Sequence, residues 1–97
     1  MIRIVKMQFR EDGVQPFLDL FEKRKEMIRN FEGCSYLSLL RDQSNSQVFF
    51  TYSIWDSPES LETYRRSELF KNTWKLTKAL FEKDAEANSV DEKFVLK

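Results

Sequence analysis

The sequence predicts an α+β fold in which a four-stranded antiparallel sheet carries helices on one face. Two observations lead to this prediction. Strand-like and helix-like patterns alternate in the order strand, helix, strand, strand, helix, strand. The segment Val48–Trp55 also has large apolar side chains on both faces, which is typical of a strand inside a sheet. The length and the scarcity of glycine and proline predict a single domain over residues 1–97.

The first predicted element is a strand over residues 2–10. Val5, Met7 and Phe9 share one face of this strand, because side chains alternate between the two faces. The opposite face begins apolar and becomes polar at Lys6. We therefore expect the first of these faces to pack against the core.

The second predicted element is an amphipathic helix. After a break at residues 11–13, apolar side chains recur at helical spacing from Val14 to about Asn30. Gly33 follows, and glycine readily takes the left-handed backbone conformation that often ends a helix. The sequence therefore marks the end of this helix clearly.

The next two predicted strands form a hairpin. Residues 34–41 have the composition of a strand, and residues 42–46 are polar. This connection is short enough to join the strand antiparallel to Val48–Trp55. We expect Val48–Trp55 to be a central strand of the sheet.

Two helices are predicted after the central strand. Ser57 is a good N-cap, Pro58 suits a first helical position, and a short helix follows to Arg66. Ser67 can cap a second, longer helix. The aligned apolar face of this second helix comprises Phe70, Trp74, Thr77 and Phe81.

The C-terminal segment is predicted to end in a strand. Residues 84–88 have the pattern of a polar helix end, and residues 89–97 contain a short strand centred on residues 94–96. The complete order is that of the ferredoxin-like β-α-β-β-α-β fold. Its helices cover only one sheet face, so we expect the second apolar face to meet a second copy of the sheet in a homodimer.

Composition excludes several classes of function. The chain has 16 basic and 16 acidic residues and no basic block, which argues against nucleic-acid binding. No apolar run is long enough to span a membrane. The lone Cys34 and the absence of an apolar leader favour a reducing cytoplasm. With no histidine and scattered carboxylates, we expect no metal site and no cofactor.

Three motifs resemble those of a known family: Glu32-Gly33 before the second strand, WDSPESL at residues 55–61, and SELF at residues 67–70. In these motifs the chain resembles antibiotic biosynthesis monooxygenase domains of the dimeric α+β barrel superfamily. The resemblance extends loosely over the whole chain. It implies two sheets paired into a barrel, a pocket between sheet and helices, and oxygenation of small phenols or quinols without metal or flavin.

The resemblance also points to individual residues. Many monooxygenase-like members have a histidine nine positions after the strand-ending tryptophan, Trp55, and Tyr64 stands there in this chain. Haem-degrading relatives have an iron-ligating histidine ten positions later, where this chain has Trp74. They also use an asparagine near Lys6 or Met7. Because the chain has no histidine, haem degradation remains only a minor option.

Each candidate also has a structural interpretation. Tyr64 donates a hydrogen bond to a substrate or helps to deprotonate it, or it fills the core. Trp74 stacks on a planar ligand or packs in the core, and Trp55 anchors a strand-to-helix corner. Lys6 stabilises an anion, or it is a solvated charge on an edge strand. Met7 completes the substrate-binding set.

Two further features are weighed in the same way. Arg65 and Arg66 are able to hold a substrate carboxylate, although adjacent basic residues on a helix are usually solvated. Cys34 follows a helix C-terminus, whose negative end disfavours a thiolate, so we expect it to be unreactive.

Two functions remain at this stage. One is a cofactor-independent monooxygenase acting on a small phenol or quinol, with Tyr64 as the catalytic residue. The other is a non-catalytic dimeric barrel that binds an apolar small molecule. An open cavity beside Tyr64 favours the first function, and a solidly packed core there excludes it.

Overall fold

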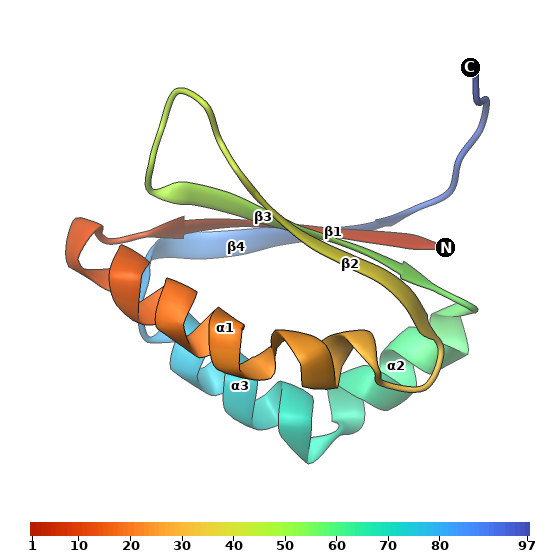
Figure 1. Ribbon diagram of the computed structural model, residues 1–97, viewed down its shortest axis with the longest axis horizontal. Helices are drawn as coiled ribbons and strands as arrows, with labels where there is room; N and C mark the ends of the chain where they lie inside the picture. Colours follow the sequence, from red (N-terminus) through yellow and green to blue (C-terminus); the bar gives the residue numbers. More distant parts are fainter.

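The computed structural model describes all of residues 1–97, and it shows a twisted four-stranded antiparallel sheet with every helix on one face (Figure 1). In chain order the elements are β1 (Ile2–Phe9), the 3-10 helix η1 (Glu11–Gly13), α1 (Val14–Arg29), β2 (Cys34–Arg41), β3 (Val48–Trp55), α2 (Pro58–Arg66), α3 (Glu68–Lys78) and β4 (Phe81–Val90). None of the helices is both long and apolar enough to cross a membrane.

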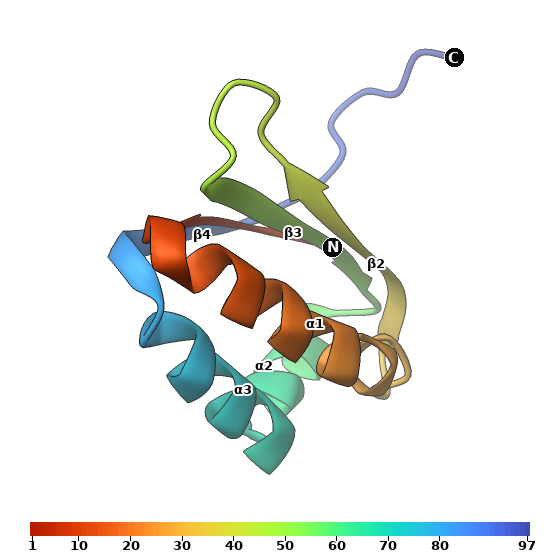
Figure 2. The same cartoon turned by 60° about the vertical axis from the view of Figure 1, so that its left-hand side comes forward.

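The sheet has the spatial order β2-β3-β1-β4, which confirms the ferredoxin-like arrangement and the central position of β3. β2 and β3 form the predicted antiparallel hairpin. Figure 2 shows α1 and α3 running side by side beneath the sheet. β1 lies between β3 and β4, so it is not an edge strand.

Serine caps begin both helices that follow β3. The Ser57 Oγ atom accepts a hydrogen bond from the Ser60 backbone N–H at 3.1 Å, and Pro58 occupies the first turn. The Ser67 Oγ atom accepts in the same way from the Phe70 N–H at 3.1 Å. Each cap satisfies a backbone donor that the helix itself leaves free. The predicted break between the two helices is confirmed.

Gly33 has the predicted left-handed backbone, with φ of +91°. A Cβ atom at this position would lie 2.5 Å from Cβ of Ser60, so any side chain would collide with the start of α2. The Gly33 carbonyl accepts a hydrogen bond from the Asp56 N–H at 2.8 Å. This glycine therefore holds the start of β2 close to the end of β3.

The structure corrects the prediction for the C-terminal segment. Phe81 does not belong to the second helix, because α3 ends at Lys78. Residues 84–88, predicted as a polar helix end, lie inside β4. The predicted strand at residues 94–96 is not formed, and β4 ends at Val90.

Backbone pairing, rather than side-chain pattern, explains the position of β4. Phe81 pairs with Phe9 on β1, and the two rings lie 5.3 Å apart. Most other β4 side chains are polar and exposed, which an edge strand tolerates and which discourages pairing with other chains. The polar sequence of β4 therefore resembles a solvated helix although the chain is extended.

The core consists of two groups of buried residues between sheet and helices. We call them the phenylalanine cluster, which comprises Met7, Phe9, Phe17 and Phe49, and the tryptophan–tyrosine cluster, which comprises Ile28, Cys34, Trp55, Leu61 and Tyr64. Phe9 is completely buried at the centre of the first cluster, where its ring stacks on Phe17 at 4.2 Å. The two clusters lie at different places along the same sheet face.

We predict that Phe9→Ala lowers the free energy of unfolding by about 3–5 kcal/mol, because it removes a fully buried ring and leaves a cavity. The matched control is Phe94→Ala, since the Phe94 side chain is 86% exposed and its loss should change stability by less than about 0.5 kcal/mol. Urea denaturation measures both variants. Equal losses for the two variants would contradict this assignment of the core.

Candidate functional site

A cavity of about 280 Å³ lies between the sheet and the helices. Its position follows from the β3 row that faces the helices, in which Thr51 and Ser53 stand between Phe49 and Trp55. Phe49 belongs to the phenylalanine cluster and Trp55 to the tryptophan–tyrosine cluster. The two small side chains leave space between the two clusters. Most of the residues that line this space are hydrophobic, so the cavity suits an apolar ligand.

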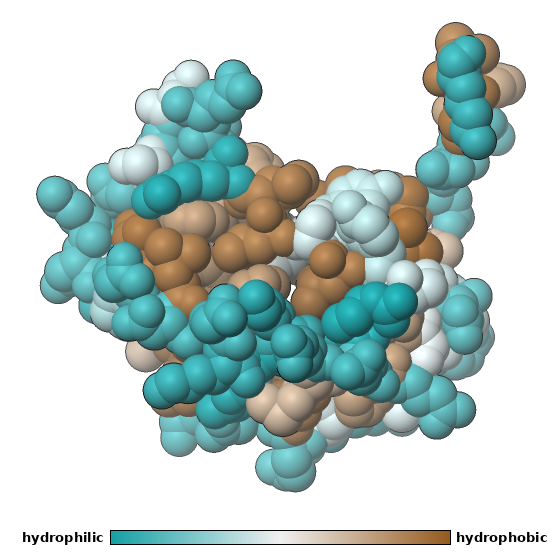
Figure 3. All heavy atoms as spheres, in the orientation of Figure 1, coloured by the Kyte–Doolittle hydropathy of each residue, from teal (hydrophilic) through white to brown (hydrophobic).

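Apolar side chains also remain accessible beside the sheet. Figure 3 shows hydrophobic atoms gathered between the sheet and α1 on one face of the molecule. A shallow groove there is lined in part by Phe21, Leu37 and Leu39. Phe21 and Leu37 also line the main cavity. Helix α1 therefore does not seal the sheet completely.

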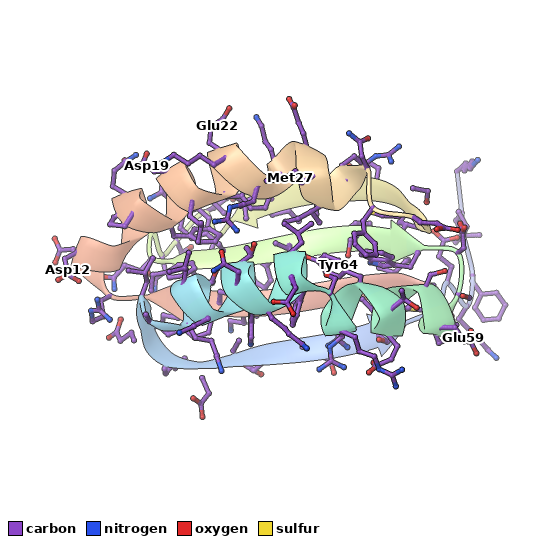
Figure 4. The ribbon with its side chains drawn as sticks, turned by 90° about the horizontal axis from the view of Figure 1, so that it is seen from below. Asp12, Asp19, Glu22, Met27, Glu59 and Tyr64 are labelled. Atoms are coloured by element: carbon purple, nitrogen blue, oxygen red, sulfur yellow. The ribbon has the colours of Figure 1, made fainter.

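Trp55 and Tyr64 close one end of the cavity. Their rings stack with centroids 5.0 Å apart, and the Trp55 Nε1–H donates a hydrogen bond to Ser53 Oγ at 2.9 Å. The Tyr64 ring also meets the edges of Phe31 and Phe70, each at 5.2 Å. Figure 4 places Tyr64 at the end of α2 that adjoins α3, and Glu59 at the opposite end. These contacts fix the orientation of the phenol ring.

The Tyr64 hydroxyl has no hydrogen-bond partner in the chain. The structure contains no fully buried side-chain oxygen or nitrogen that lacks a partner, so this hydroxyl still reaches accessible space. Tyr64 also lines the cavity. Burial raises the pKa of Tyr64 far above its usual value, and the neighbouring Cys34 raises it further. At neutral pH the hydroxyl is therefore a donor and not a base.

Trp74 contributes a second aromatic surface. Its indole lines the cavity, stacks on Phe70 with centroids 5.9 Å apart, and meets the edge of the Phe81 ring at 5.6 Å. The preceding residue of α3, Thr73, accepts a hydrogen bond from Arg24 of α1 at 2.9 Å. This bond ties the two helices together over the cavity.

The structure brings together four of the five residues proposed from the sequence. Tyr64, Trp74, Trp55 and Met7 all line the cavity. Lys6 does not line the cavity. Side chains alternate along β1, so Lys6 lies on the opposite face of the sheet from Arg3 and Val5. Nor does it lie on an edge strand, since β1 is internal.

Sequence reasoning missed Arg3, Thr51 and Ser53 as cavity residues. The sequence did contain the information needed to place Arg3, because alternate residues of a strand share a face and Arg3 therefore lies on the same face as Val5 and Met7. The two small residues lie between large ones on β3, a pattern that marks space rather than packing.

The residues that line the cavity do not suit a metal or a haem. They include no histidine, cysteine or carboxylate, and the chain has no group of three or more potential metal ligands. Cys34 lies in the tryptophan–tyrosine cluster, where burial raises the pKa of its thiol and so disfavours the reactive thiolate.

Residues 1–76 match the model of the family described as antibiotic biosynthesis monooxygenase. No curated protein matches the chain significantly. A solved structure of a conserved protein from Methanosarcina mazei Go1 is 28% identical with a TM-score of 0.84, covering 90% of this chain and 87% of that chain. A solved structure of an antibiotic biosynthesis monooxygenase is 19% identical with a TM-score of 0.87, covering 95% of this chain and 98% of that chain. A protein from Mycobacterium tuberculosis is 17% identical with a TM-score of 0.84, covering 96% of this chain and 97% of that chain. The last two likenesses confirm the fold.

We predict that Tyr64 makes stability fall at high pH. Because its folded-state pKa is raised, the unfolded chain loses this proton first, above about pH 10, and folding then loses up to about 1.4 kcal/mol per pH unit. Below that pH both states keep the proton and the contribution is constant. Urea denaturation of the wild type and Tyr64→Phe should therefore show a stability difference that shifts against the wild type above about pH 10.

Leu76→Ala serves as the control, because Leu76 is 43% exposed on α3 and the variant keeps Tyr64. The free energy of unfolding of Leu76→Ala should decline with rising pH as that of the wild type does. A pH-independent difference between wild type and Tyr64→Phe would show that the folded-state pKa is not raised.

Proposed function

The chain belongs to the antibiotic biosynthesis monooxygenase family, and on that premise we propose that it is a cofactor-independent monooxygenase acting on a small phenol or quinol. The family match supports the general type of activity, and the cavity supports the class of substrate. The single free thiol, Cys34, favours the reducing cytoplasm as the place of action.

The observation that carries this proposal is an apolar cavity containing a phenol donor with no partner. An apolar cavity of about 150 Å³ is enough to bind benzene. The cavity of about 280 Å³ therefore suits a molecule of one or two rings. The Tyr64 hydroxyl is available to a polar atom of that molecule, because no group of the chain occupies it. A small aromatic molecule with a ring oxygen matches both features.

Four side chains have proposed roles toward the substrate. Trp74 offers an aromatic face, and Trp55 and Met7 form apolar walls. Tyr64 donates a hydrogen bond to the substrate oxygen and so stabilises negative charge that develops there as the substrate gives up electrons. Its raised pKa suits this role, because the hydroxyl keeps its proton throughout the neutral range.

The reaction requires little chemistry from the protein. A quinol ring gains one oxygen atom of O₂ at a carbon that bears hydrogen and becomes a hydroxyquinone, while the second oxygen atom leaves as water with the two hydrogen atoms that the ring loses. In an anthrone-like phenol, which reacts through its keto form, a ring CH₂ group becomes a carbonyl group with the same release of water. The substrate supplies all the electrons for this change. The chain contributes a dry site, orientation of the ring, and the hydrogen bond from Tyr64.

We also propose that the protein acts as a homodimer joined through its open sheet face. The residues of this face that lie opposite one another on the paired strands include Ile4, Tyr36, Leu40, Phe50, Tyr52 and Ile54. Tyr36 and Leu40 are almost half exposed, and the rings of Tyr36 and Tyr52 meet at 5.8 Å. An apolar face of this kind favours burial against another protein surface, and a second copy supplies a matching one.

We expect purified protein to accelerate oxygen consumption by hydroquinones or anthrone-like phenols above their uncatalysed autoxidation. Tyr64→Phe should lower kcat/KM roughly 100-fold, because it removes the hydrogen bond to the developing charge. Trp74→Ala should lower it roughly tenfold through lost stacking. An oxygen electrode measures each rate.

Tyr36→Phe and Leu76→Ala are the matched controls, because neither side chain lines the cavity, and both should retain activity. Failure to accelerate any member of the substrate panel would refute the oxygenase. It would favour the alternative of a non-catalytic dimeric barrel that binds an apolar small molecule.

For the dimer, we predict that Tyr52→Asp converts the protein to a monomer, because it places a charge in the centre of the proposed interface. Sedimentation velocity should show twice the chain mass for the wild type and the chain mass for the variant. Leu76→Asp, on the helical side of the molecule, should remain dimeric. A monomeric wild type at high protein concentration would overturn the proposal.

A further inference from the structure

The charged side chains that line the cavity all have the same sign. Arg3 of β1 and Arg65 of α2 line it, and no aspartate or glutamate does. The other polar lining groups are hydroxyls and two indole N–H groups, and several already have partners within the chain. Thr77 donates to the Thr73 carbonyl at 2.7 Å, and Ser53 accepts from Trp55 at 2.9 Å. The cavity is therefore apolar, with positive charge at its margin.

Arg3 has no anionic partner. Its cross-strand neighbours are Ser53 on β3 and Ser89 on β4, and its Nη1 atom donates to Ser89 Oγ at 3.0 Å. A guanidinium carries five N–H donors, so most of those on Arg3 remain free. Burial lowers the pKa of Arg3, and the positive charge of Arg65 lowers it further, although Glu62 opposes both. An anion beside Arg3 would relieve this repulsion.

Arg65 shares its carboxylate with another arginine. Glu62 Oε2 lies 3.4 Å from Arg65 Nη1, and Glu62 Oε1 lies 3.4 Å from Arg66 Nε. Arg3 is near enough for the charges of Arg65 and Glu62 to act on it, so three arginines and one glutamate make this region positive overall. Both pairs are long and partly exposed to solvent, so neither holds its arginine strongly.

Both cavity arginines lie near the aromatic end of the site. Arg3 stands directly opposite Ser53, the residue that accepts the Trp55 hydrogen bond. Arg65 follows Tyr64 on α2, and Figure 4 shows Tyr64 where α2 meets α3. A ring bound beside Tyr64 would therefore have an anionic substituent within reach of both guanidinium groups.

We propose that the cavity binds an aromatic carboxylate whose anionic group is held by Arg3 and Arg65. Guanidinium groups match the planar geometry of a carboxylate and bind it through paired N–H donors. The small apolar volume accepts the ring. This inference deepens the proposed function and rests on it for the identity of the ligand as substrate: a phenol or quinol that carries a carboxylate.

The test is calorimetric titration of the full-length protein with naphthoate and with naphthamide, its neutral analogue of nearly the same shape. Naphthoate should bind at least about tenfold more tightly. Arg3→Met and Arg65→Met should each weaken naphthoate binding by about tenfold and leave naphthamide binding within about twofold, because only the charged contact is lost.

Arg66→Met is the matched control. Arg66 is adjacent to Arg65 and also pairs with Glu62, but its side chain is 79% exposed and does not line the cavity. It carries the same change in net charge and should leave naphthoate binding within about twofold. Unchanged naphthamide binding by Arg3→Met and Arg65→Met shows that the cavity of these variants is still folded.

Three outcomes would overturn the proposal: equal affinity of the wild type for the two probes, an equal loss in Arg66→Met, or tighter binding of naphthyl phosphate than of naphthoate. The last would replace the carboxylate by a phosphate ester. Titration in the absence of oxygen measures binding without turnover. A protein that selects naphthoate through the two arginines but never accelerates oxygen consumption would refute the oxygenase alone.

Discussion

The position of two small side chains between two large ones along β3 is the constraint on which the rest of the structure depends. The row that faces the helices reads Phe49, Thr51, Ser53, Trp55. Phe49 belongs to the phenylalanine cluster and Trp55 to the tryptophan–tyrosine cluster, so the helices rest on two separate packed groups. The space between these groups is the cavity. Because packed interiors tolerate few voids, small residues placed here preserve a site at the expense of packing.

Elements with their own start and stop signals could be predicted from the sequence alone. Ser57 and Ser67 cap two helices, and Gly33 has a backbone that other residues rarely adopt. β4 carries no such signal. Phe81 follows Thr77 at a spacing that fits a helix, and the polar residues after it resemble a solvated helix end. Only hydrogen bonds to β1, distant in sequence, make this segment a strand.

The candidate site could be predicted where aromatic side chains mark it. Tyr64, Trp55 and Trp74 are recognisable from their positions relative to the strand end, and all three line the cavity. Arg3 was not recognised, because a charged residue near the start of a strand resembles an ordinary surface group. Its role depends on which side chains face it across the sheet, and two serines in those positions leave its charge without a partner. These neighbours are set by the pairing of β1 with β3 and β4, and the pairing with β4 could not be foreseen because β4 was not recognised as a strand.

Successive side chains of a strand point to opposite faces of the sheet, and this separates the ligand cavity from the proposed dimer interface. On β1, Arg3 and Met7 face the cavity whereas Lys6 faces the opposite side, and on β3 Ser53 and Tyr52 divide in the same way. A side chain can therefore change one surface without touching the other. Any influence of dimerisation on ligand binding must pass through the backbone of β1, β2 and β3, which both surfaces share. A shift of strand twist or register is the route by which a partner subunit would alter the spacing of the two guanidinium groups.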